Sequence, residues 1–297
     1  MRYYLSPSLM CMDMMKLTEQ LHFLNGKADR LHVDIMDGHY VKNLALSASF
    51  VAQIRPYTSL PIDVHLMVEE PASFIPSLIE AGADAISLHP ETICREAFRL
   101  INMLRQAGKE VGVVLNPATP VESIQHYLHL LDKVTVMTVD PGYAGQPFIP
   151  EMLAKIAQLR QLKESGNLSF LLEVDGSCNR NTYRELLGAG AQILVMGSSG
   201  LFRPDMPLEQ AWEKCPAICP PRCTPTSSYK GANDVRKSLC FWFIQFRHGC
   251  QGGALSGTGR VVSGLRKYDQ RRGERGEPGH RRAKSGGECP LYRQDWQ

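Results

Sequence analysis

Two polar residues share one face of an apolar segment near the start of the chain. His32 and Asp34 alternate with apolar residues, and Gly38 ends the run. In an extended strand, side chains point alternately to opposite faces, so the imidazole and the carboxylate project to the same side, about 7 Å apart. Such a pair can bind one divalent metal ion. It can equally be a buried polar pair that does no chemistry.

The elements that position this pair form a regular alternation over residues 3–214. The expected strands are Tyr3–Met10, Leu31–Met36, Ile62–Val68, Ala85–His89, Val111–Leu115, Val134–Val139, Phe170–Val174 and Ile193–Met196. The expected helices are Met14–Leu24, Ser47–Arg55, Ala72–Ala81, Arg95–Ala107, Val121–Leu130, Glu151–Glu164, Asn181–Leu187 and Leu208–Lys214. Eight strand–helix repeats of about 25 residues predict an α/β fold, a closed (β/α)₈ TIM barrel. An open doubly wound sheet rarely contains so many even units.

The barrel places other polar residues near His32 and Asp34, because the chemistry of such folds lies at the C-terminal ends of the strands. His65 lies on the third strand, and Asp175 follows the seventh. A lone histidine in an apolar strand is more often a hydrogen-bonded core residue, and Asp175 could cap the next helix. The convergence of all four at one mouth predicts a four-ligand metal site instead. Further polar residues expected at these strand ends are Ser6, Ser8, His89, Asn116, Asp140 and Glu173.

Glycine-rich loops follow the last three strands. They are Asp140–Gln146, Gly176-Ser177 and Gly197-Ser198. Loops after late barrel strands, with free backbone N–H groups, often bind phosphate, and glycine lets the backbone approach the anion closely. The alternative is that these glycines only make tight turns. Three such loops on one side of the barrel favour a phosphate-binding site.

Charge divides the chain near residue 214. Residues 1–214 contain 18 Lys and Arg against 24 Asp and Glu, a net charge of −6, whereas residues 215–297 contain 15 against 6, a net charge of +9. We therefore expect a barrel at 1–214 and a basic tail rich in Gly, Cys and Arg at 215–297. No apolar run approaches 18 residues, and the first residues lack the apolar region of a signal peptide. A cytoplasmic protein with no membrane partner is expected.

The periodic pattern dissolves after Lys214, at the end of the short eighth helix that we expect. We therefore expect a truncated eighth helix and a tail that is disordered or non-native sequence. An Arg/Gly-rich segment that binds nucleic acid is an alternative, with salt-dependent RNA binding as its signature. Nucleic acid is nevertheless not an expected partner, because the intact polar cluster argues against an inert barrel. A zinc knuckle formed by the tail cysteines matches no strong spacing template.

Five motifs, in order over about 210 residues, resemble the ribulose-phosphate 3-epimerase family. They are Ser6-Pro7-Ser8-Leu9, His32-Val33-Asp34-Ile35-Met36-Asp37-Gly38, His65-Leu66-Met67, Asp140-Pro141-Gly142-Tyr143-Ala144-Gly145-Gln146-Pro147-Phe148 and Glu173-Val174-Asp175-Gly176. Five further short motifs are similar to those of the D-allulose-6-phosphate 3-epimerase branch of that family. They are Met10-Cys11-Met12-Asp13, His89-Pro90-Glu91-Thr92, Thr138-Val139-Asp140-Pro141, Ser177-Cys178-Asn179 and Gly200-Leu201-Phe202.

The resemblance implies roles for individual residues. His32, Asp34, His65 and Asp175 would bind one divalent metal ion, which could be zinc, iron(II), cobalt or manganese. Asp34 and Asp175 would also be the catalytic acid/base pair. The implied substrate contacts are Ser8, His65, Gly142, Tyr143, Ala144, Gly145, Asp175, Gly176, Ser177, Gly197 and Ser198. Met36, Met67 and Met137 resemble methionines that pack over the metal site. The chain departs from the family at Lys42, where proline is usual, and it is expected to be a homo-oligomer.

The implied reaction explains why two carboxylates are needed. Epimerisation at C3 of a 2-ketose phosphate removes a proton next to a carbonyl and returns one to the opposite face, which requires two acid/base groups on opposite sides. A divalent metal ion would stabilise the enediolate as a Lewis acid. The expected reaction converts D-allulose 6-phosphate to D-fructose 6-phosphate. The alternative converts D-ribulose 5-phosphate to D-xylulose 5-phosphate.

Overall fold

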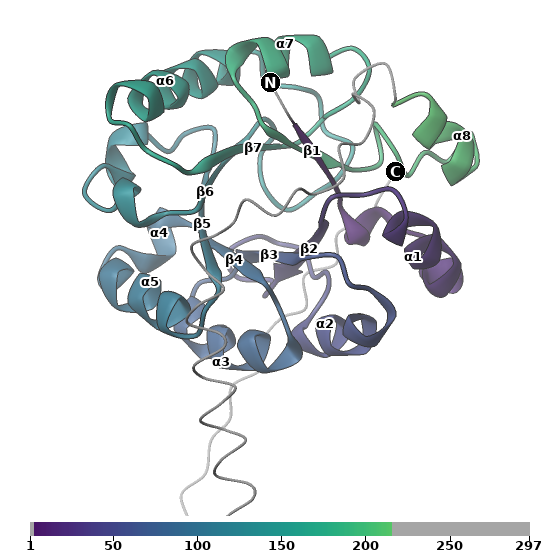
Figure 1. Ribbon diagram of the computed structural model, residues 1–297, viewed down its shortest axis with the longest axis horizontal. Coiled ribbons are helices and arrows are strands. Elements are labelled where there is room, and N and C mark those ends of the chain that lie inside the picture. Colours follow the sequence, from purple (N-terminus) through teal and green to yellow (C-terminus); the bar gives the residue numbers. More distant parts are fainter. Residues whose placement is uncertain (1–2, 216–297) are drawn as a thin grey trace, which may run out of the picture. The chain divides into compact units, whose positions relative to one another are not determined.

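Eight parallel strands form the predicted TIM barrel in the computed structural model, which describes residues 3–215 of the 297-residue chain (Figure 1). The strands are β1 (Tyr4–Pro7), β2 (Leu31–Met36), β3 (Ile62–Met67), β4 (Ala85–Leu88), β5 (Glu110–Leu115), β6 (Lys133–Met137), β7 (Leu171–Asp175) and β8 (Ile193–Met196). Their order in the sheet is β1-β8-β7-β6-β5-β4-β3-β2, and a parallel bridge between Ser8 and His32 joins the two ends. Every predicted strand is therefore present.

Helices surround the barrel, as Figure 1 shows. They are α1 (Leu17–Asn25), α2 (Ala48–Ile54), α3 (Pro71–Ala81), α4 (Pro90–Ile93), α5 (Ala97–Gln106), α6 (Met152–Ser165), α7 (Tyr183–Ala189) and α8 (Leu208–Glu213). Short 3₁₀ turns are η1 (Leu9–Cys11), η2 (Met14–Lys16), η3 (Arg55–Tyr57), η4 (Val121–Ile124) and η5 (Leu128–Leu130). The Ser47 side chain caps α2 by accepting a hydrogen bond from the backbone of Phe50, and Gly82 ends α3 with φ of +92°.

The α-helix predicted over residues 121–130 is wrong. The segment forms the two 3₁₀ turns η4 and η5 instead. Val121, Ile124 and Leu128 are buried, so the apolar spacing did identify the face that packs on the barrel. The segment is rich in β-branched, aromatic and histidine residues, which are weak helix formers, and this composition favours short turns over a continuous helix.

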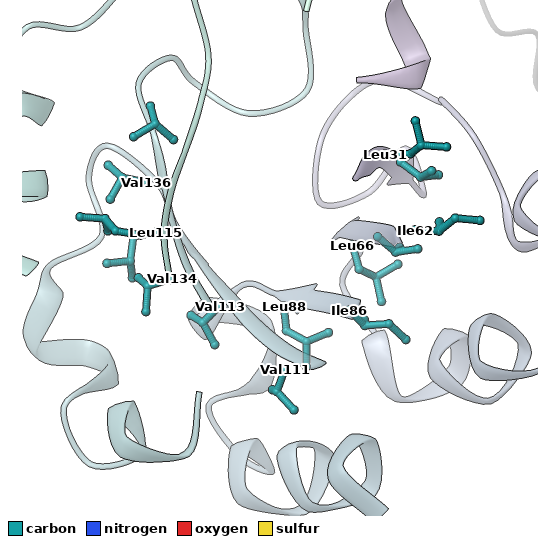
Figure 2. Close-up of a cluster of buried hydrophobic side chains, with 14 of the residues drawn as sticks. Leu31, Ile62, Leu66, Ile86, Leu88, Val111, Val113, Leu115, Val134 and Val136 are labelled. Carbon is teal, nitrogen blue, oxygen red and sulfur yellow. The ribbon is translucent and has the colours of Figure 1, made fainter. Parts of the chain in front are cut away.

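Alternation along the strands separates an apolar outer face from a polar interior. Buried Leu, Ile and Val side chains of β2 to β6 form the cluster shown in Figure 2, which belongs to the main hydrophobic core. The other face of each strand points into the barrel. The register of β2 and β3 pairs His32 with Asp63 and Asp34 with His65. This register places three of the four predicted metal ligands side by side.

A buried ion network fills the barrel interior next to His32. Lys133 on β6 donates to Glu173 on β7 at 2.5 Å and also to Asp63 on β3. Arg30 contacts the same Asp63 carboxylate at 3.3 Å. Burial opposes the charge on Lys133, but the two carboxylates raise the pKa of this ammonium group above its usual value. Glu173 was expected at the mouth of the barrel; it lies within β7 and belongs to this network.

Lys133→Met is expected to lower the free energy of unfolding by about 3–5 kcal/mol, because it leaves the buried carboxylates of Asp63 and Glu173 without their shared cation. Urea denaturation followed by far-UV circular dichroism measures the loss. Lys27→Met is the matched control, since Lys27 is exposed on the turn after α1. Equal midpoints for the two variants would contradict this account of the network.

The last described element is short and packs onto the first helix. α8 contains six residues, and Trp212 lies edge-on to Phe23 of α1 with ring centroids 6.2 Å apart. Cys215, placed by composition at the start of the tail, is buried in the main core. The rest of the tail predicted over 215–297, residues 216–297, lies outside the described residues. Within the described part of the chain, no helix is long and apolar enough to cross a membrane.

Candidate active site and metal centre

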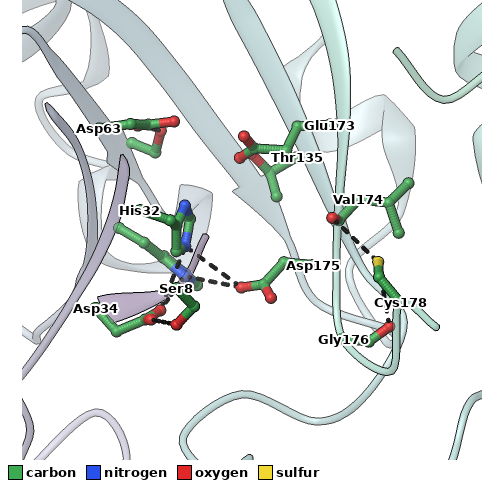
Figure 3. A network of polar contacts seen from close by, with 12 residues as sticks. Ser8, His32, Asp34, Asp63, Thr135, Glu173, Val174, Asp175, Gly176 and Cys178 are labelled. Carbon is green, nitrogen blue, oxygen red and sulfur yellow. Dashed lines mark hydrogen bonds and ion pairs between the residues drawn. The ribbon is translucent and has the colours of Figure 1, made fainter. Parts of the chain in front are cut away.

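The four predicted ligands meet at the barrel mouth. Figure 3 shows three of them, His32, Asp34 and Asp175. Nε2 of His32 lies 3.3 Å from Oδ1 of Asp34 and 3.5 Å from Oδ2 of Asp175. Nδ1 of His65 lies 3.2 Å and 3.4 Å from the same two oxygens. Each carboxylate therefore contacts both imidazoles. His32 and His65 are fully buried, whereas the Asp175 side chain is 17% exposed.

These separations fit a small divalent ion. Nitrogen and oxygen ligands about 2.0–2.2 Å from a tetrahedral ion lie about 3.3–3.6 Å from one another. The four ligand atoms all lie within 4.8 Å of one another. Nε2 of His32 makes no hydrogen bond to any described residue, although it is buried. A buried nitrogen of this kind needs a partner, and the cluster is consistent with a divalent-metal site.

The cluster favours positive charge at its centre. Burial opposes ionisation of Asp34, but the nearby charges of His32 and His65 and the hydrogen bond with His65 hold the pKa of its carboxyl well below the usual range. Burial likewise opposes protonation of His32, but Asp34 and Asp175 raise its pKa well above the ordinary value. Two ionised carboxylates facing two imidazoles attract a cation, whether protons on the rings or a metal ion between them.

Ser8 orients one of the carboxylates. It follows β1, is almost fully buried, and its hydroxyl donates to Oδ2 of Asp34 at 2.7 Å. The other Asp34 oxygen, Oδ1, faces the two imidazoles. The carboxylate is therefore held at both oxygens. Sequence reasoning assigned Ser8 to the substrate, and the structure adds this contact with Asp34.

A cavity adjoins the cluster, and it gathers all the predicted substrate contacts. The predicted residues that line it are Ser8, Asp34, His65, Gly142, Tyr143, Ala144, Gly145, Asp175, Gly176, Ser177, Gly197 and Ser198. Met36, Met67 and Met137 also line it. No Lys or Arg of the described residues does. An anion bound here would therefore depend on backbone N–H groups and hydroxyls.

Turns, rather than regular helix ends, form the predicted phosphate loops. After β7, Ser177 adopts φ of +50°, a left-handed conformation that costs a non-glycine residue about 1–2 kcal/mol. Its carbonyl accepts hydrogen bonds from the side chains of Asn179 and Thr182, both at 2.8 Å. After β8, the Gly197 carbonyl accepts from the backbone of Leu201 at 2.9 Å. These bonds hold both turns at the cavity rim.

Gly176→Ala is expected to raise the KM for a phosphorylated substrate at least about tenfold. Gly176 has φ of +117°, and a Cβ there would lie 2.7 Å from a methyl group of Val139 and 2.9 Å from its backbone nitrogen. The turn must therefore shift away from Val139, which would displace the backbone predicted to contact the phosphate. Gly188→Ala is the control, because nothing lies within 4 Å of a Cβ at that position in α7. Steady-state kinetics and inhibition by inorganic phosphate measure the effect, and an unchanged KM would count against a phosphate site here.

Two loops join above one side of the cavity. The Tyr143 hydroxyl donates to the Lys42 carbonyl at 2.5 Å, and the Asn43 side chain donates to the Gly142 carbonyl at 2.7 Å. Lys42 is the position where the family usually has proline. Although Lys42 lacks the rigid proline ring, its carbonyl accepts the hydrogen bond from Tyr143. This bond and the one from Asn43 restrain the loop after β2.

Sequence reasoning gave no role to several residues of the site. Cys11, Gln146 and Ser199 line the cavity. Burial raises the pKa of the Cys11 thiol to about 11, so it is not ionised at neutral pH. Gln146 and Ser199 directly follow predicted substrate contacts in the sequence. This adjacency is the sequence feature that could have identified them as cavity residues.

The fold and the site define a (β/α)₈-barrel enzyme with a buried His/Asp cluster. The profile of the ribulose-phosphate 3-epimerase family matches residues 4–202. A ribulose-phosphate 3-epimerase of Bacillus subtilis is 43% identical over 196 residues, which cover 65% of this chain and 90% of the relative. One from Aquifex aeolicus is 39% identical over 199 residues, covering 67% and 89%. The chain belongs to the ribulose-phosphate 3-epimerase family. It is an isomerase, a carbohydrate epimerase that acts on a sugar phosphate.

Similarity to solved structures supports the fold alone. A tryptophan synthase alpha-subunit from Pyrococcus furiosus superposes with a TM-score of 0.54 at 19% identity, covering 73% of this chain and 99% of that one. Such low identity carries no information about the reaction. The TIM barrel is thus a shared framework for different sites.

Proposed function

We propose that the chain interconverts D-ribulose 5-phosphate and D-xylulose 5-phosphate by two-base proton transfer at C3. One observation carries the mechanism: Asp34 on β2 and Asp175 on β7 flank the same two imidazoles at the floor of one cavity (Figure 3). Two carboxylates on different sides of a bound carbon can each reach one face of it. That arrangement is what inversion at C3 requires.

The residues then have separate tasks. His32, Asp34, His65 and Asp175 would hold a divalent metal ion, which when bound supplies Lewis-acid stabilisation of negative charge on the substrate oxygens. Asp34 removes the C3 proton of one epimer, and Asp175 returns a proton from the other side; the roles reverse for the reverse reaction. Ser8 holds Asp34 in position. The turns at Gly142–Gly145, Gly176-Ser177 and Gly197-Ser198 hold the phosphate and so fix C3 between the carboxylates.

The relatives support the five-carbon substrate. The two bacterial relatives above are named ribulose-phosphate 3-epimerases, and so is an Arabidopsis thaliana relative, described as chloroplastic, that is 39% identical over 198 residues. Identity near 40% extends over about nine tenths of the bacterial enzymes.

D-allulose 6-phosphate is the second candidate substrate, favoured by the amino-acid sequence of the loops that line the cavity. Met10 and Cys11 line the cavity, and they belong to the motif that resembles the allulose branch. The two substrates undergo the same chemistry and differ by one carbon between the reacting centre and the phosphate. Discrimination can therefore come from the distance between the carboxylates and the phosphate loops and from contacts with the additional hydroxyl group.

A direct comparison of kcat/KM for the two ketose phosphates tests the proposal. The metal-supplemented protein is expected to turn over D-ribulose 5-phosphate at least about tenfold more efficiently, because a phosphate loop placed for the shorter ketose misplaces C3 of the longer one. The reverse preference would establish the allulose assignment. Absence of epimerisation with either substrate would contradict the proposed function altogether.

A further inference from the structure

A third histidine, outside the predicted ligand set, contacts the metal cluster. Nε2 of His89 lies 2.9 Å from Nε2 of His65. His89 directly follows β4 and is fully buried. The opposite ring nitrogen of His65, Nδ1, faces Asp34 and Asp175. The His65 ring is therefore held between the carboxylates on one edge and His89 on the other.

The 2.9 Å contact determines where the protons lie. Two ring nitrogens at this distance share one hydrogen, so one must donate and the other must accept. Nδ1 of His65 must be unprotonated to bind a metal ion, and the proton of the neutral ring then sits on Nε2. His65 is consequently the donor, and Nε2 of His89 must present a lone pair. The proton of His89 is left on its Nδ1.

The surroundings of His89 suit a neutral acceptor. His89 is fully buried beside His65. Its Nδ1 makes no hydrogen bond to a described residue, and the nearest carboxylate oxygen, Oε2 of Glu91, is 3.9 Å away. The Tyr40 ring packs against His89 with centroids 4.7 Å apart.

The supports of His89 are themselves fixed. The side chain of Asn116 donates to the Tyr40 hydroxyl at 2.6 Å and to Glu91 at 3.2 Å. Tyr40 belongs to the loop after β2, and Asn116 follows β5. The ring of His89 is therefore packed by residues from separate parts of the barrel mouth, and it has little freedom to turn away from His65.

We propose that His89 is a positioning residue that fixes the tautomer and ring orientation of His65 for metal binding. A ligand histidine ordinarily donates its second N–H to a carboxylate, a carbonyl or water. Here a neutral imidazole accepts that hydrogen bond. The role rests on the metal site assigned under the proposed function, and it adds a residue that touches neither the metal nor the substrate.

Two variants separate the hydrogen bond from the packing. His89→Phe keeps an aromatic ring against Tyr40 and removes the acceptor. His89→Gln restores an acceptor oxygen near the position of Nε2. His129→Phe is the control, because His129 is exposed on η5. Calorimetric titration of each metal-free protein with Co²⁺ alone is expected to give a Kd raised about 10–100-fold for His89→Phe. His89→Gln is expected to remain within about threefold of the unchanged protein.

The outcomes distinguish this role from the metal site itself. Unchanged Co²⁺ affinity in His89→Phe, beside normal binding by the unchanged protein, would overturn the role of His89 alone. Failure of the unchanged protein to bind one Co²⁺ per chain would overturn the metal site and the role of His89 together. A packing role would weaken binding more in His89→Gln, which loses the aromatic ring against Tyr40, than in His89→Phe, so rescue by His89→Gln contradicts it.

A measurement on the unsubstituted protein tests the same proposal even if the His89 variants do not fold. Long-range ¹H–¹⁵N spectra of the zinc-loaded protein report which ring nitrogen carries the proton. The Nε2–H tautomer for His65 and the Nδ1–H tautomer for His89 are expected. A proton on Nε2 of His89 would make it a donor and would overturn the proposal.

Discussion

Asp34→Asn and Asp175→Asn are each expected to lower kcat for epimerisation by about 10³-fold or more, with little change in the unfolding midpoint of the metal-free protein. An amide can neither accept nor return a proton at neutral pH, and general acid–base catalysis by one group contributes about 10²–10⁴-fold. Both side chains approach the same two imidazoles, so each substitution also removes one of the proposed metal ligands. Kinetics are therefore measured at saturating metal.

Hydrogen exchange makes this prediction specific to each carboxylate. Each variant retains one base, which can still remove the C3 proton of the epimer whose hydrogen faces it. In D₂O, Asp34→Asn is expected to exchange C3 of one epimer only, and Asp175→Asn is expected to exchange C3 of the other. Neither variant inverts the centre, because the second proton donor is missing. Proton NMR of each isolated ketose phosphate measures the exchange.

Asp13→Asn is the matched control for these variants. Asp13 is exposed, its side chain accepts a hydrogen bond from the backbone of Met15, and asparagine caps helices as well as aspartate does. This control should retain normal turnover. Near-normal epimerisation by either active-site variant would contradict the two-base assignment, and exchange of the same epimer by both would show that only one carboxylate moves protons.

Removal of divalent metal is the second change with a large expected effect. Treatment with a chelator should abolish turnover, and readdition of Zn²⁺, Co²⁺, Mn²⁺ or Fe²⁺ should restore it, because the four clustered side chains offer the nitrogen and oxygen donors that these ions take. Binding only to the folded state also stabilises it, by about 2.7 kcal/mol when free metal is 100 times Kd. Thermal unfolding with and without metal measures this shift.

His65→Phe is expected to lose the metal-dependent part of the stability, whereas the exposed-site variant His129→Phe should keep it. Elemental analysis verifies that the chelated protein is free of metal. Turnover by metal-free protein at the untreated rate would contradict a catalytic metal. Equal stabilisation of His65→Phe and the unchanged protein would place the metal elsewhere.

Sequence pattern was sufficient to locate the mouth of the barrel. β2 and β8 have the predicted bounds, because each is a short apolar run with clear ends. Barrel topology then brings the ends of distant strands to one place, so His32, Asp34, His65 and Asp175 could be grouped before their positions were known. The helix predicted over 121–130 failed because its apolar spacing also suits two 3₁₀ turns.

Contacts that depend on register between strands could not be predicted in this way. Asp34 lies opposite His65 because of the pairing of β2 with β3, and no local signal specifies that register. The partnership of Lys133 with Asp63 and Glu173 joins three strands far apart in sequence. His89 was placed at the end of its strand, but its contact with His65 depends on side-chain packing between neighbouring strands.

The origin of the C3 hydrogen in the product tests the central claim most directly. In a single turnover of protium-containing D-ribulose 5-phosphate in D₂O, one carboxylate removes the protium and the other delivers a hydrogen that has exchanged with solvent. The account predicts D-xylulose 5-phosphate that carries deuterium at C3, beside unreacted substrate that still carries protium. Product that retains the protium of the substrate at C3 would show that a single group moves the proton across, and would contradict the assignment of Asp34 and Asp175 to opposite faces.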